Sequence, residues 1–463
     1  MLGILITLVT TPYLTRVLGK SCLGIDSYVL SVVQICEVMG SLGTTIYGNR
    51  EIAYVRKDPD KLTRTFWELL FLRLSLGVIV GAIYLFIAFH SAYKIVFLIQ
   101  AITLVSYYLD VSWMYIGLED VRPVTLYSAF AKITATIAVF VLIKDPSDLY
   151  LYVFLIASSQ AVITLLLFSG CNGRIGRCRL GQLNIKRHLR PVIALFLPQA
   201  ASSLYVLFDK TMIGLLASDM SRTSIYDKAE MIVKAPVVFA VAMTTVMMPR
   251  IANYYAEDRM EDIQGLVHQS LDLMLLLFVP ISAGMAIVAR IFVPAYLGPD
   301  YMDSVQVIWI LSSIILAIGM SNVSGAQFLI GCNGTKYLAI SYFTSAVFNI
   351  TGNLFLIPLL DERGASITTC VAEWMVVIIQ FWAVHRLMGR VGIPELIYKK
   401  LIAAAIMSAV IIPLYYFGIN MLVLLMQIIV GAAVYFISLK LLHDSGLEGV
   451  LAILTPILHK NRG

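Results

Sequence analysis

Long apolar runs follow one another along almost the whole chain, with only short polar segments between them. Each run is about 20 residues long, the length that a helix needs to cross a hydrocarbon core roughly 30 Å thick. Lipid cannot satisfy backbone polar groups, so each run is predicted to be a helix that satisfies them internally. The predicted spans are 1–16, 27–49, 65–89, 95–118, 123–143, 149–169, 191–217, 226–249, 266–290, 302–330, 337–359, 365–388, 400–418 and 421–440. The pattern therefore predicts an all-α, polytopic integral membrane protein with about 14 transmembrane helices.

The composition agrees with this class. Of the 463 residues, 59% are hydrophobic and only 13% are charged, whereas soluble domains carry about 25% charged residues. The net charge of +6 requires no nucleic-acid partner. Cys171, Cys178 and His188 share one basic segment, but their spacing fits no zinc motif. The segment GCNGTK at 331–336 lacks the spacing of a phosphate-binding loop. We therefore expect no metal and no cofactor.

Lysine and arginine are distributed unevenly over the connecting segments. They concentrate in 50–64, 173–190, 250–259 and 385–390, which all lie on one side if the spans alternate across the membrane. Because the side rich in Lys and Arg stays cytoplasmic, both termini are predicted to be cytoplasmic. The segment 173–190 is also basic enough to contact anionic lipid headgroups, although a topology signal is the simpler interpretation. The outward connections are short, which disfavours an enzyme acting on external polymers.

Two distant segments resemble each other. GTTIYGNREIAYVRKDPDK (43–61) and MTTVMMPRIANYYAEDRME (243–261) share Thr-Thr, Arg, Tyr and Asp at matching positions, and 16–28 matches 210–226 upstream. We infer a duplication of six spans. Because six is even, the halves enter the membrane in the same sense and are related by a parallel pseudo-twofold axis. The predicted regions are an N-terminal six-helix lobe (1–169), a basic cytoplasmic linker (170–190), a C-terminal six-helix lobe (191–388), and an extra helix pair with a cytoplasmic tail (389–463).

Charged side chains within the spans concentrate in the equivalent spans 1, 2, 7 and 8 of the two halves. Each costs roughly 2.5–3.5 kcal/mol to insert near a helix centre, so it normally faces a cavity or a partner. A cationic lining suits a phosphate or pyrophosphate group, and carboxylates suit proton or sodium coupling. The predicted substrate-binding cations are Arg16, Lys132, Lys210, Lys228 and Lys234, and the predicted coupling acids are Glu37, Asp209 and Glu230.

Structural interpretations of these charges stay open. Asp209 and Lys210 could neutralise each other, and Glu230 and Lys234 have the i,i+4 spacing of an ion pair that merely joins helices. Lys132 is either a cavity cation or a surface lysine that reaches the interface. Glu37 shares one helix face with Gln34, Ser41 and Thr44. Asp272 and Glu373 lie near predicted helix ends and are expected at the interface.

The segment LDVSWMYIGLED (109–120) resembles the Asp-x-x-Trp…Gly-x-Glu signature of Wzx-type oligosaccharide flippases, polysaccharide transporters of the MATE-like MOP superfamily. TPYLTRVLG (11–19), LGTTIYGNREIA (42–53), FDKTMIG (208–214) and the segment 348–374 are similar to further parts of that family in the same order. Relative to the family, the chain begins unusually close to Thr11, so span 1 looks clipped.

The resemblance implies a MATE-like or MurJ-like fold and a function in the bacterial cytoplasmic membrane. The protein would flip an undecaprenyl-pyrophosphate-linked oligosaccharide to the outer leaflet by ion-coupled alternating access, for capsule, O-antigen or exopolysaccharide. Polysaccharide polymerase machinery is an expected partner. Within the signature, Asp110 is a candidate coupling residue. Trp113 is expected to be a packing anchor, and Glu119 is expected to contact Arg122 at a helix end.

Three alternatives differ in substrate or chemistry. A MATE-type multidrug antiporter would share the fold but would need an acidic rather than a cationic lining. A lipid II flippase would also bind a pyrophosphate and is therefore harder to exclude. A polysaccharide polymerase or membrane glycosyltransferase is disfavoured by the short outward connections. We expect a transporter without enzymatic activity.

Overall fold

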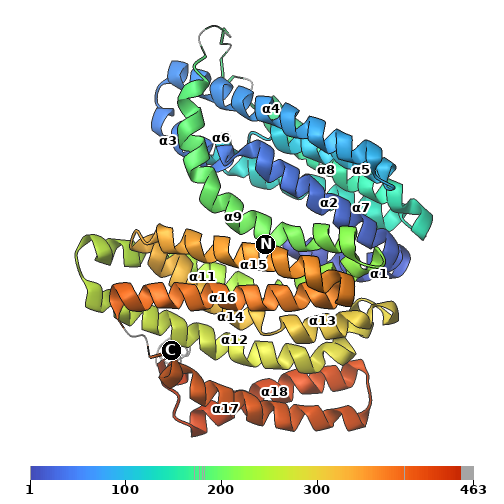
Figure 1. Ribbon diagram of the computed structural model, residues 1–463, viewed down its shortest axis with the longest axis vertical. Coiled ribbons are helices and arrows are strands. Elements are labelled where there is room, and N and C mark those ends of the chain that lie inside the picture. The colour runs from blue at the N-terminus through green and yellow to red at the C-terminus, as the bar shows by residue number, and fades with distance from the viewer. Residues whose placement is uncertain are drawn as a thin grey trace, which may run out of the picture. The chain divides into compact units, whose positions relative to one another are not determined.

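The computed structural model describes residues 2–449 except 172, 177, 180, 182, 390 and 391, and every regular element in these residues is helical (Figure 1). The predicted cytoplasmic tail at 450–463 lies outside the described residues. The helices are α1 (Leu2–Val17), α2 (Gly19–Ser41), α3 (Thr44–Val55), α4 (Pro59–His90), α5 (Lys94–Leu109), α6 (Ser112–Gly117), α7 (Arg122–Leu142), α8 (Leu149–Ser169), α9 (Lys186–Leu216), α10 (Ser221–Lys234), α11 (Val237–Ala256), α12 (Met260–Tyr296), α13 (Asp303–Leu311), α14 (Ile314–Ser321), α15 (Thr335–Leu360), α16 (Glu362–Met388), α17 (Ile393–Ile411) and α18 (Met421–Leu441). Short 3₁₀ turns lie at Pro146–Asp148, Pro299–Tyr301 and Ile412–Phe417, and the segment η4 (Asn322–Leu329) is a π-helix.

Twelve helical segments of the described residues are long and apolar enough to cross a membrane. They correspond to twelve of the fourteen predicted spans. Helices also occur at the other two predicted spans, α1 with 16 residues and α9 with 31 residues. The helical class is confirmed, and the count of about fourteen stays a prediction.

Four predicted spans are interrupted. The second predicted span consists of α2 and α3, because Leu42 and Gly43 between them have left-handed φ angles of 44° and 76°. The fourth consists of α5 and α6, which meet at Asp110 and Val111. The eighth is divided into α10 and α11 ahead of the proline at 236, and the tenth into α13, α14 and the π-helix. The prediction of continuous helices was wrong at these positions.

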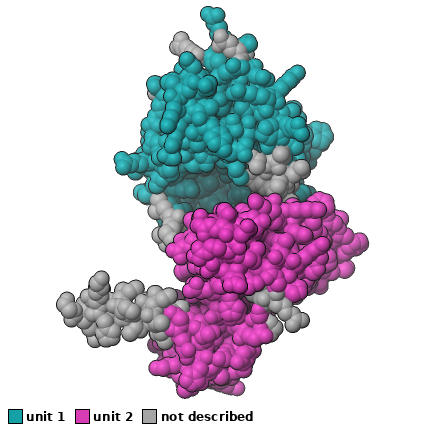
Figure 2. Space-filling model, turned by 90° about the vertical axis from the view of Figure 1, so that its left-hand side faces the viewer, with its two compact units in different colours: residues 1–224 teal, residues 225–463 magenta. Residues whose placement is uncertain are grey.

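The chain divides into two compact units, residues 1–224 and 225–463 (Figure 2). Unit 1 contains α1 to α9, and unit 2 contains α11 to α18, while α10 spans the division. A division into compact units does not have to coincide with the boundary of a sequence repeat. The lobe boundary at the basic linker 170–190 therefore stays a prediction.

In unit 2, the extra helix pair α17–α18 is joined to α12 through a buried charge cluster. Lys400 of α17 is fully buried, and its Nζ lies 2.5 Å from Asp272 of α12 and 2.9 Å from Asp444. The carboxylate of Asp272 is thus a buried partner of Lys400, while its expected position at the membrane interface stays a prediction. Removing one partner of such a buried pair leaves an uncompensated charge, so this cluster fixes the helix pair to the rest of unit 2.

Candidate functional site

In unit 1, a charged cluster lies where spans 2 and 4 are interrupted. Glu37 of α2 is half-buried, Arg73 of α4 is 2% exposed, and Asp110 follows the end of α5. Glu37 interacts electrostatically with both Arg73 and Asp110. Two of the predicted coupling acids are thus brought together around one buried arginine.

Arg73 adds hydrogen bonds to two backbone carbonyls at the break in span 4, where the Asp110 N–H also bonds the Tyr107 carbonyl. Its Nη2 donates to the carbonyl of Tyr107 at 2.6 Å, and its Nη1 donates to the carbonyl of Asp110 at 3.3 Å and to Oγ1 of Thr45 at 3.4 Å. Carbonyls at a helix end have no partner within the helix, and in lipid each unsatisfied group costs several kcal/mol. The guanidinium supplies these partners from inside the protein.

The carboxylate of Asp110 has a local role. It accepts hydrogen bonds from the backbone N–H of Ser112 at 3.1 Å and from the Ser112 hydroxyl at 2.6 Å. A carboxylate that receives the orphan N–H groups at a helix start stabilises that helix. Asp110, which precedes the N-cap residue Val111, therefore holds the first residue of α6.

Trp113 and Glu119 complete the signature segment. Trp113 is buried, stacks on Phe66 with ring centroids 5.6 Å apart, and donates to the Asp110 carbonyl at 3.0 Å. Its role as a packing anchor is confirmed. Glu119 pairs with Arg56 at 2.7 Å rather than with Arg122, because its left-handed φ of 61° turns the chain away from a regular helix end.

The other predicted site residues of unit 1 lie on α1, α7 and α9. Arg16 and Lys132 are exposed, and Nη1 of Arg16 donates to the carbonyl of Pro12 at 2.7 Å. On α9, Asp209 is buried and Lys210 is half-buried.

Helix α9 packs closely on α2. Ser31 and Thr211 share a hydrogen bond of 2.7 Å between their hydroxyls, and Gly214 lies directly against the ring of Tyr28. A methyl group at 214 would collide with that ring. The polar stretch of α9 that carries Asp209 is thus held in a defined register along α2.

In unit 2, the predicted residues of α10 form two ion pairs. Lys228 lies 2.7 Å from Asp227, and Lys234 lies 2.6 Å from Glu230, one helical turn away. Glu230 is buried and Lys234 is partly exposed. Two of the five predicted cations are therefore partnered by acids, which lowers the positive charge that they offer to a ligand.

Sequence reasoning did not single out two buried polar groups. One is Arg73, whose position in an apolar run was the available signal, because a charge at that depth normally has a function. The other is a group on α15 and α16 in which Asn349, Asn353 and Thr369 are fully or almost fully buried. Asn353 and Asn349 share a hydrogen bond of 3.3 Å, and Tyr226 bonds Thr369 at 3.1 Å. No regular spacing connects these segments in the sequence.

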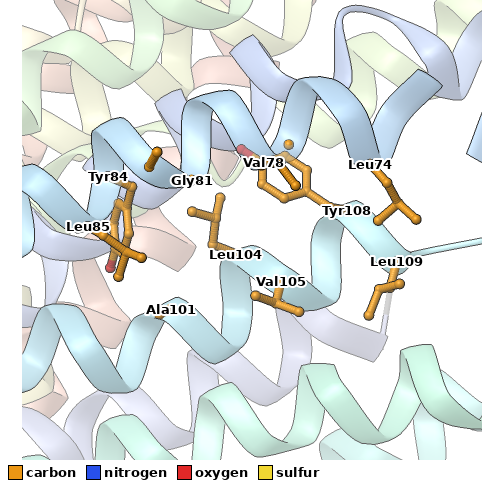
Figure 3. Close-up of a pocket in the computed structure, with 12 residues that line it drawn as sticks. Leu74, Val78, Gly81, Tyr84, Leu85, Ala101, Leu104, Val105, Tyr108 and Leu109 are labelled. Carbon is orange, nitrogen blue, oxygen red and sulfur yellow. The ribbon is translucent and has the colours of Figure 1, made fainter. Parts of the chain in front are cut away.

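An apolar groove of about 490 Å³ lies between α4 and α5 (Figure 3). The hydroxyls of Tyr84 and Tyr108 bond the carbonyls of Phe97 and Cys36, both at 2.7 Å, so the two rings contribute mainly carbon to the lining. None of the predicted site residues lines the groove.

A buried polar cluster fixes the start of α9 to α3 and α4. The carboxylate of Glu68 lies 2.9 Å from Nε2 of His188 and 2.6 Å from Arg187, and it accepts the backbone N–H of Asn184 at 2.6 Å. Nδ1 of His188 bonds the Tyr47 hydroxyl at 2.9 Å. The segment that precedes α9 is therefore firmly attached to unit 1.

Two protein-family models match the chain. A model described as polysaccharide biosynthesis protein matches residues 1–255, and a model described as lipid II flippase MurJ matches residues 130–432. Two curated relatives carry the name O-antigen transporter. The one from Escherichia coli (strain K12) is 25% identical over 80% of this chain and 91% of the relative, and the one from Shigella dysenteriae is 23% identical over 77% and 89%.

Solved structures show the same fold. The lipid II flippase MurJ in an inward closed conformation matches with a TM-score of 0.77 and 14% identity, over 95% of this chain and 97% of that one. An inward-facing multidrug resistance MATE family transporter of the MOP superfamily matches with a TM-score of 0.59 and 15% identity, over 83% and 98%. At these identities the similarity establishes the fold, which is the MurJ-like and MATE-like architecture expected from the sequence.

Proposed function

Since the chain belongs to the polysaccharide biosynthesis protein family, whose model covers more than half of it, we propose that it flips a lipid-linked oligosaccharide across the membrane. The observation that carries this proposal is the near full-length similarity to relatives named O-antigen transporters. Twelve segments able to span a membrane agree with a multi-pass transporter. The substrate would be an undecaprenyl-pyrophosphate-linked repeat unit for O-antigen, capsule or exopolysaccharide.

We place the protein in the bacterial cytoplasmic membrane with both termini on the cytoplasmic side, as the distribution of Lys and Arg indicates. The sugar and pyrophosphate group would cross by alternating access, with the lipid tail remaining in the bilayer. No bond of the substrate is broken, so the protein is proposed to be a transporter without enzymatic activity. A polysaccharide polymerase system is the proposed recipient of the flipped unit.

The cations proposed to bind the pyrophosphate are Arg16, Lys132, Lys210, Lys228 and Lys234. Arg16 and Lys210 are tested first, because they lie in the equivalent spans 1 and 7 of the two predicted halves. Replacement of Arg16 or Lys210 by Ala should slow flipping and leave the amount of folded protein unchanged. Wild-type transport in both variants would contradict a cationic binding site.

Coupling to a proton or sodium gradient is proposed to use Glu37, with Asp110, Asp209 and Glu230 as further candidates. The carboxylate of Asp110 bonds Ser112, and that of Glu230 pairs with Lys234. Glu37 interacts electrostatically with both Arg73 and Asp110. A change in the charge of the Glu37 carboxylate would therefore alter the electrostatic interactions of the whole cluster.

The deciding experiment is a deletion strain whose lipid extract is analysed by mass spectrometry while surface polysaccharide is scored in parallel. Complete repeat units should accumulate on the lipid carrier, and surface polymer should disappear. Labelling from each side of the membrane should then place these units in the cytoplasmic leaflet. Units in the outer leaflet would assign the defect to polymerisation instead. Normal lipid-linked units together with normal polymer would contradict the proposal.

A second candidate is a lipid II flippase, favoured by the MurJ family model over residues 130–432 and by the MurJ-like fold. This function predicts that depletion of the protein stops growth and that lipid II accumulates. The same mass-spectrometric analysis distinguishes the two substrates, because lipid II and an oligosaccharide repeat unit differ in mass and sugar content.

A further inference from the structure

Among the described residues of unit 1 there are three apolar core clusters, and two of them meet where spans 2 and 4 are interrupted. The first, which we call the α3–α6 block, is built around Tyr47, Phe66 and Trp113. The second, the α2–α5 block, is built around Tyr28, Phe97 and Tyr108. Because packed cores move as rigid bodies rather than deforming continuously, the boundary between two cores is where bending within a unit is least costly.

Two spans are interrupted at this boundary. Leu42 and Gly43 separate α2, in one block, from α3, in the other, and Asp110 and Val111 separate α5 from α6 in the same way. Leu42 has a left-handed φ of 44°, which costs a residue with a side chain roughly 1–2 kcal/mol. Strain of this kind persists where the surrounding structure imposes it, often at switch regions.

The third span, α4, also has a weak point near this boundary. Helix α4 carries Gly77 and Gly81, and glycine within a helix costs roughly 0.5–1 kcal/mol relative to alanine. The apolar groove lies beside both glycines, and Figure 3 shows Leu74 and Leu109 at one end of it and Tyr84 at the other. The groove therefore begins next to the break at 110 and leaves open space where α4 would bend.

The α3–α6 block is closely packed. A Cβ atom at Gly48 of α3 would lie 2.7 Å from the Trp113 ring of α6, and one at Gly117 of α6 would lie 2.6 Å from the backbone oxygen of Asn49. Neither glycine leaves room for a side chain. Figure 1 shows α3 and α6 side by side at the same end of unit 1, and these contacts make them one body.

Arg73 connects the two blocks at their boundary. From α4 it reaches Thr45, at the start of α3, and the carbonyls of Tyr107 and Asp110, at the end of α5. A planar guanidinium with five donors can bridge such separated acceptors, whereas a lysine ammonium cannot hold the same geometry.

Unit 2 also has interrupted spans, but its break in span 8 does not lie at the position that matches Leu42–Gly43. Span 8 is divided between Lys234 and Val237, and the tenth span ends in the π-helix η4. Gln327 of η4 donates to Thr244 of α11 at 3.4 Å, which joins the same two spans.

We propose that unit 1 contains a hinge at Leu42–Gly43, Asp110–Val111 and the Gly77–Gly81 segment, with Arg73 as the positioning residue that holds the α3–α6 block against the α2–α5 block. The α3–α6 block would tilt as one rigid body. This tilt would widen or narrow unit 1 at the end of the spans where the block lies. The use of this motion in transport rests on the proposed function, but the motion itself does not.

The test is a set of distance distributions between spin labels in a variant without the six native cysteines, reconstituted in lipid nanodiscs without substrate. The pair Tyr54–Ile116 lies within the α3–α6 block, and the pair Tyr54–Ile95 connects the two blocks; all three side chains are exposed. Arg73→Gln should add a second population to Tyr54–Ile95 and leave Tyr54–Ile116 unchanged. Arg50→Gln, an exposed arginine of α3, is the matched control and should change neither.

Unchanged Tyr54–Ile95 distances in Arg73→Gln would overturn the positioning role, and broadening of both pairs would overturn the rigid block. If Arg73→Gln does not fold, Leu42→Gly provides the second test, because it removes the strain at the break together with the contact of the Leu42 side chain with the α3–α6 block. It should broaden Tyr54–Ile95 alone, and an unchanged distribution would refute the hinge. Since no substrate is present, failure here is independent of failure of the flippase proposal.

Discussion

Arg73 bonds the backbone carbonyl of Asp110 at 3.3 Å, while the Asp110 carboxylate turns to Ser112. One residue thus ends α5 through its main chain and holds the first residue of α6 through its side chain. An acid in the middle of an apolar run is usually interpreted as a substrate or ion site. Here the geometry also gives a structural reason for the acid at position 110. The structural role and a role in ion coupling predict different behaviour of Asp110 variants.

Replacement of Asp110 by Asn should leave folding nearly unchanged, since the amide oxygen can accept the Ser112 N–H and the amide NH2 can donate to the Ser112 hydroxyl. Replacement by Ala should destabilise unit 1 by about 1 kcal/mol, the usual cost of losing a cap. Thermal unfolding in detergent measures both. If Asp110→Asn folds normally but loses gradient-dependent transport, the carboxylate has a coupling role in addition to capping.

The Glu37→Gln variant should fold and should lose its dependence on the ion gradient. The substitution is nearly isosteric and removes the charge that interacts with Arg73 and Asp110. Transport into vesicles with and without an imposed proton or sodium gradient measures the effect. Glu51→Gln, which removes a carboxylate paired with Arg50 on α3, is the control. The same gradient dependence in Glu37→Gln and wild type would remove Glu37 from the coupling role.

Variants of the Glu230–Lys234 ion pair of α10 distinguish an effect on stability from an effect on transport. Lys234→Met leaves Glu230 buried without its lysine and should destabilise the protein by about 3 kcal/mol, the lower end for a broken buried pair. Adding Glu230→Gln should restore most of this loss. If Lys234 also binds substrate, transport stays impaired in the stable double variant. Equal instability of the single and double variants would show that the pair contributes nothing to folding.

The two glycines of α4 should respond oppositely to alanine. A Cβ atom at Gly77 would lie 2.7 Å from the Tyr108 ring, whereas one at Gly81 meets open space. Gly77→Ala should therefore cost about 1–3 kcal/mol through overpacking. Gly81→Ala should gain up to about 1 kcal/mol from helix propensity. Thermal unfolding of the two variants side by side is the measurement, and a destabilised Gly81→Ala would show that the groove is filled in the folded protein.

The lengths of the apolar runs predicted the helices well, because crossing a membrane imposes both length and composition. The Glu230–Lys234 pair was also accessible, because i,i+4 neighbours face each other on a helix. The breaks were not predicted. Leu42 is an ordinary helix former, and its left-handed conformation comes from the packing around it.

Contacts between distant segments were equally inaccessible from one sequence. Lys400 is the first residue of the predicted span 400–418, yet it pairs with Asp272, 128 residues earlier. Arg73 was visible as a charge within a span, but its acceptors are backbone carbonyls. Backbone groups carry no sequence signal, so the partner of that arginine could be found only in the structure.

The attachment of the segment before α9 should weaken in acid. Burial lowers the pKa of His188 below its ordinary 6.5, and the hydrogen bond to Glu68 opposes this effect; Arg187, Glu51 and Tyr47 also face the imidazole. The folded protein therefore favours neutral His188, while the unfolded chain takes up a proton below about pH 6.5. This contribution to stability is present above pH 6.5 and is lost as the pH falls through the lower pKa of the folded state.

The melting temperature of wild type should fall more between about pH 7.5 and 5.5 than that of His188→Gln. These two pH values bracket the ordinary histidine pKa of about 6.5. Parallel pH profiles of the two proteins would contradict the depressed pKa.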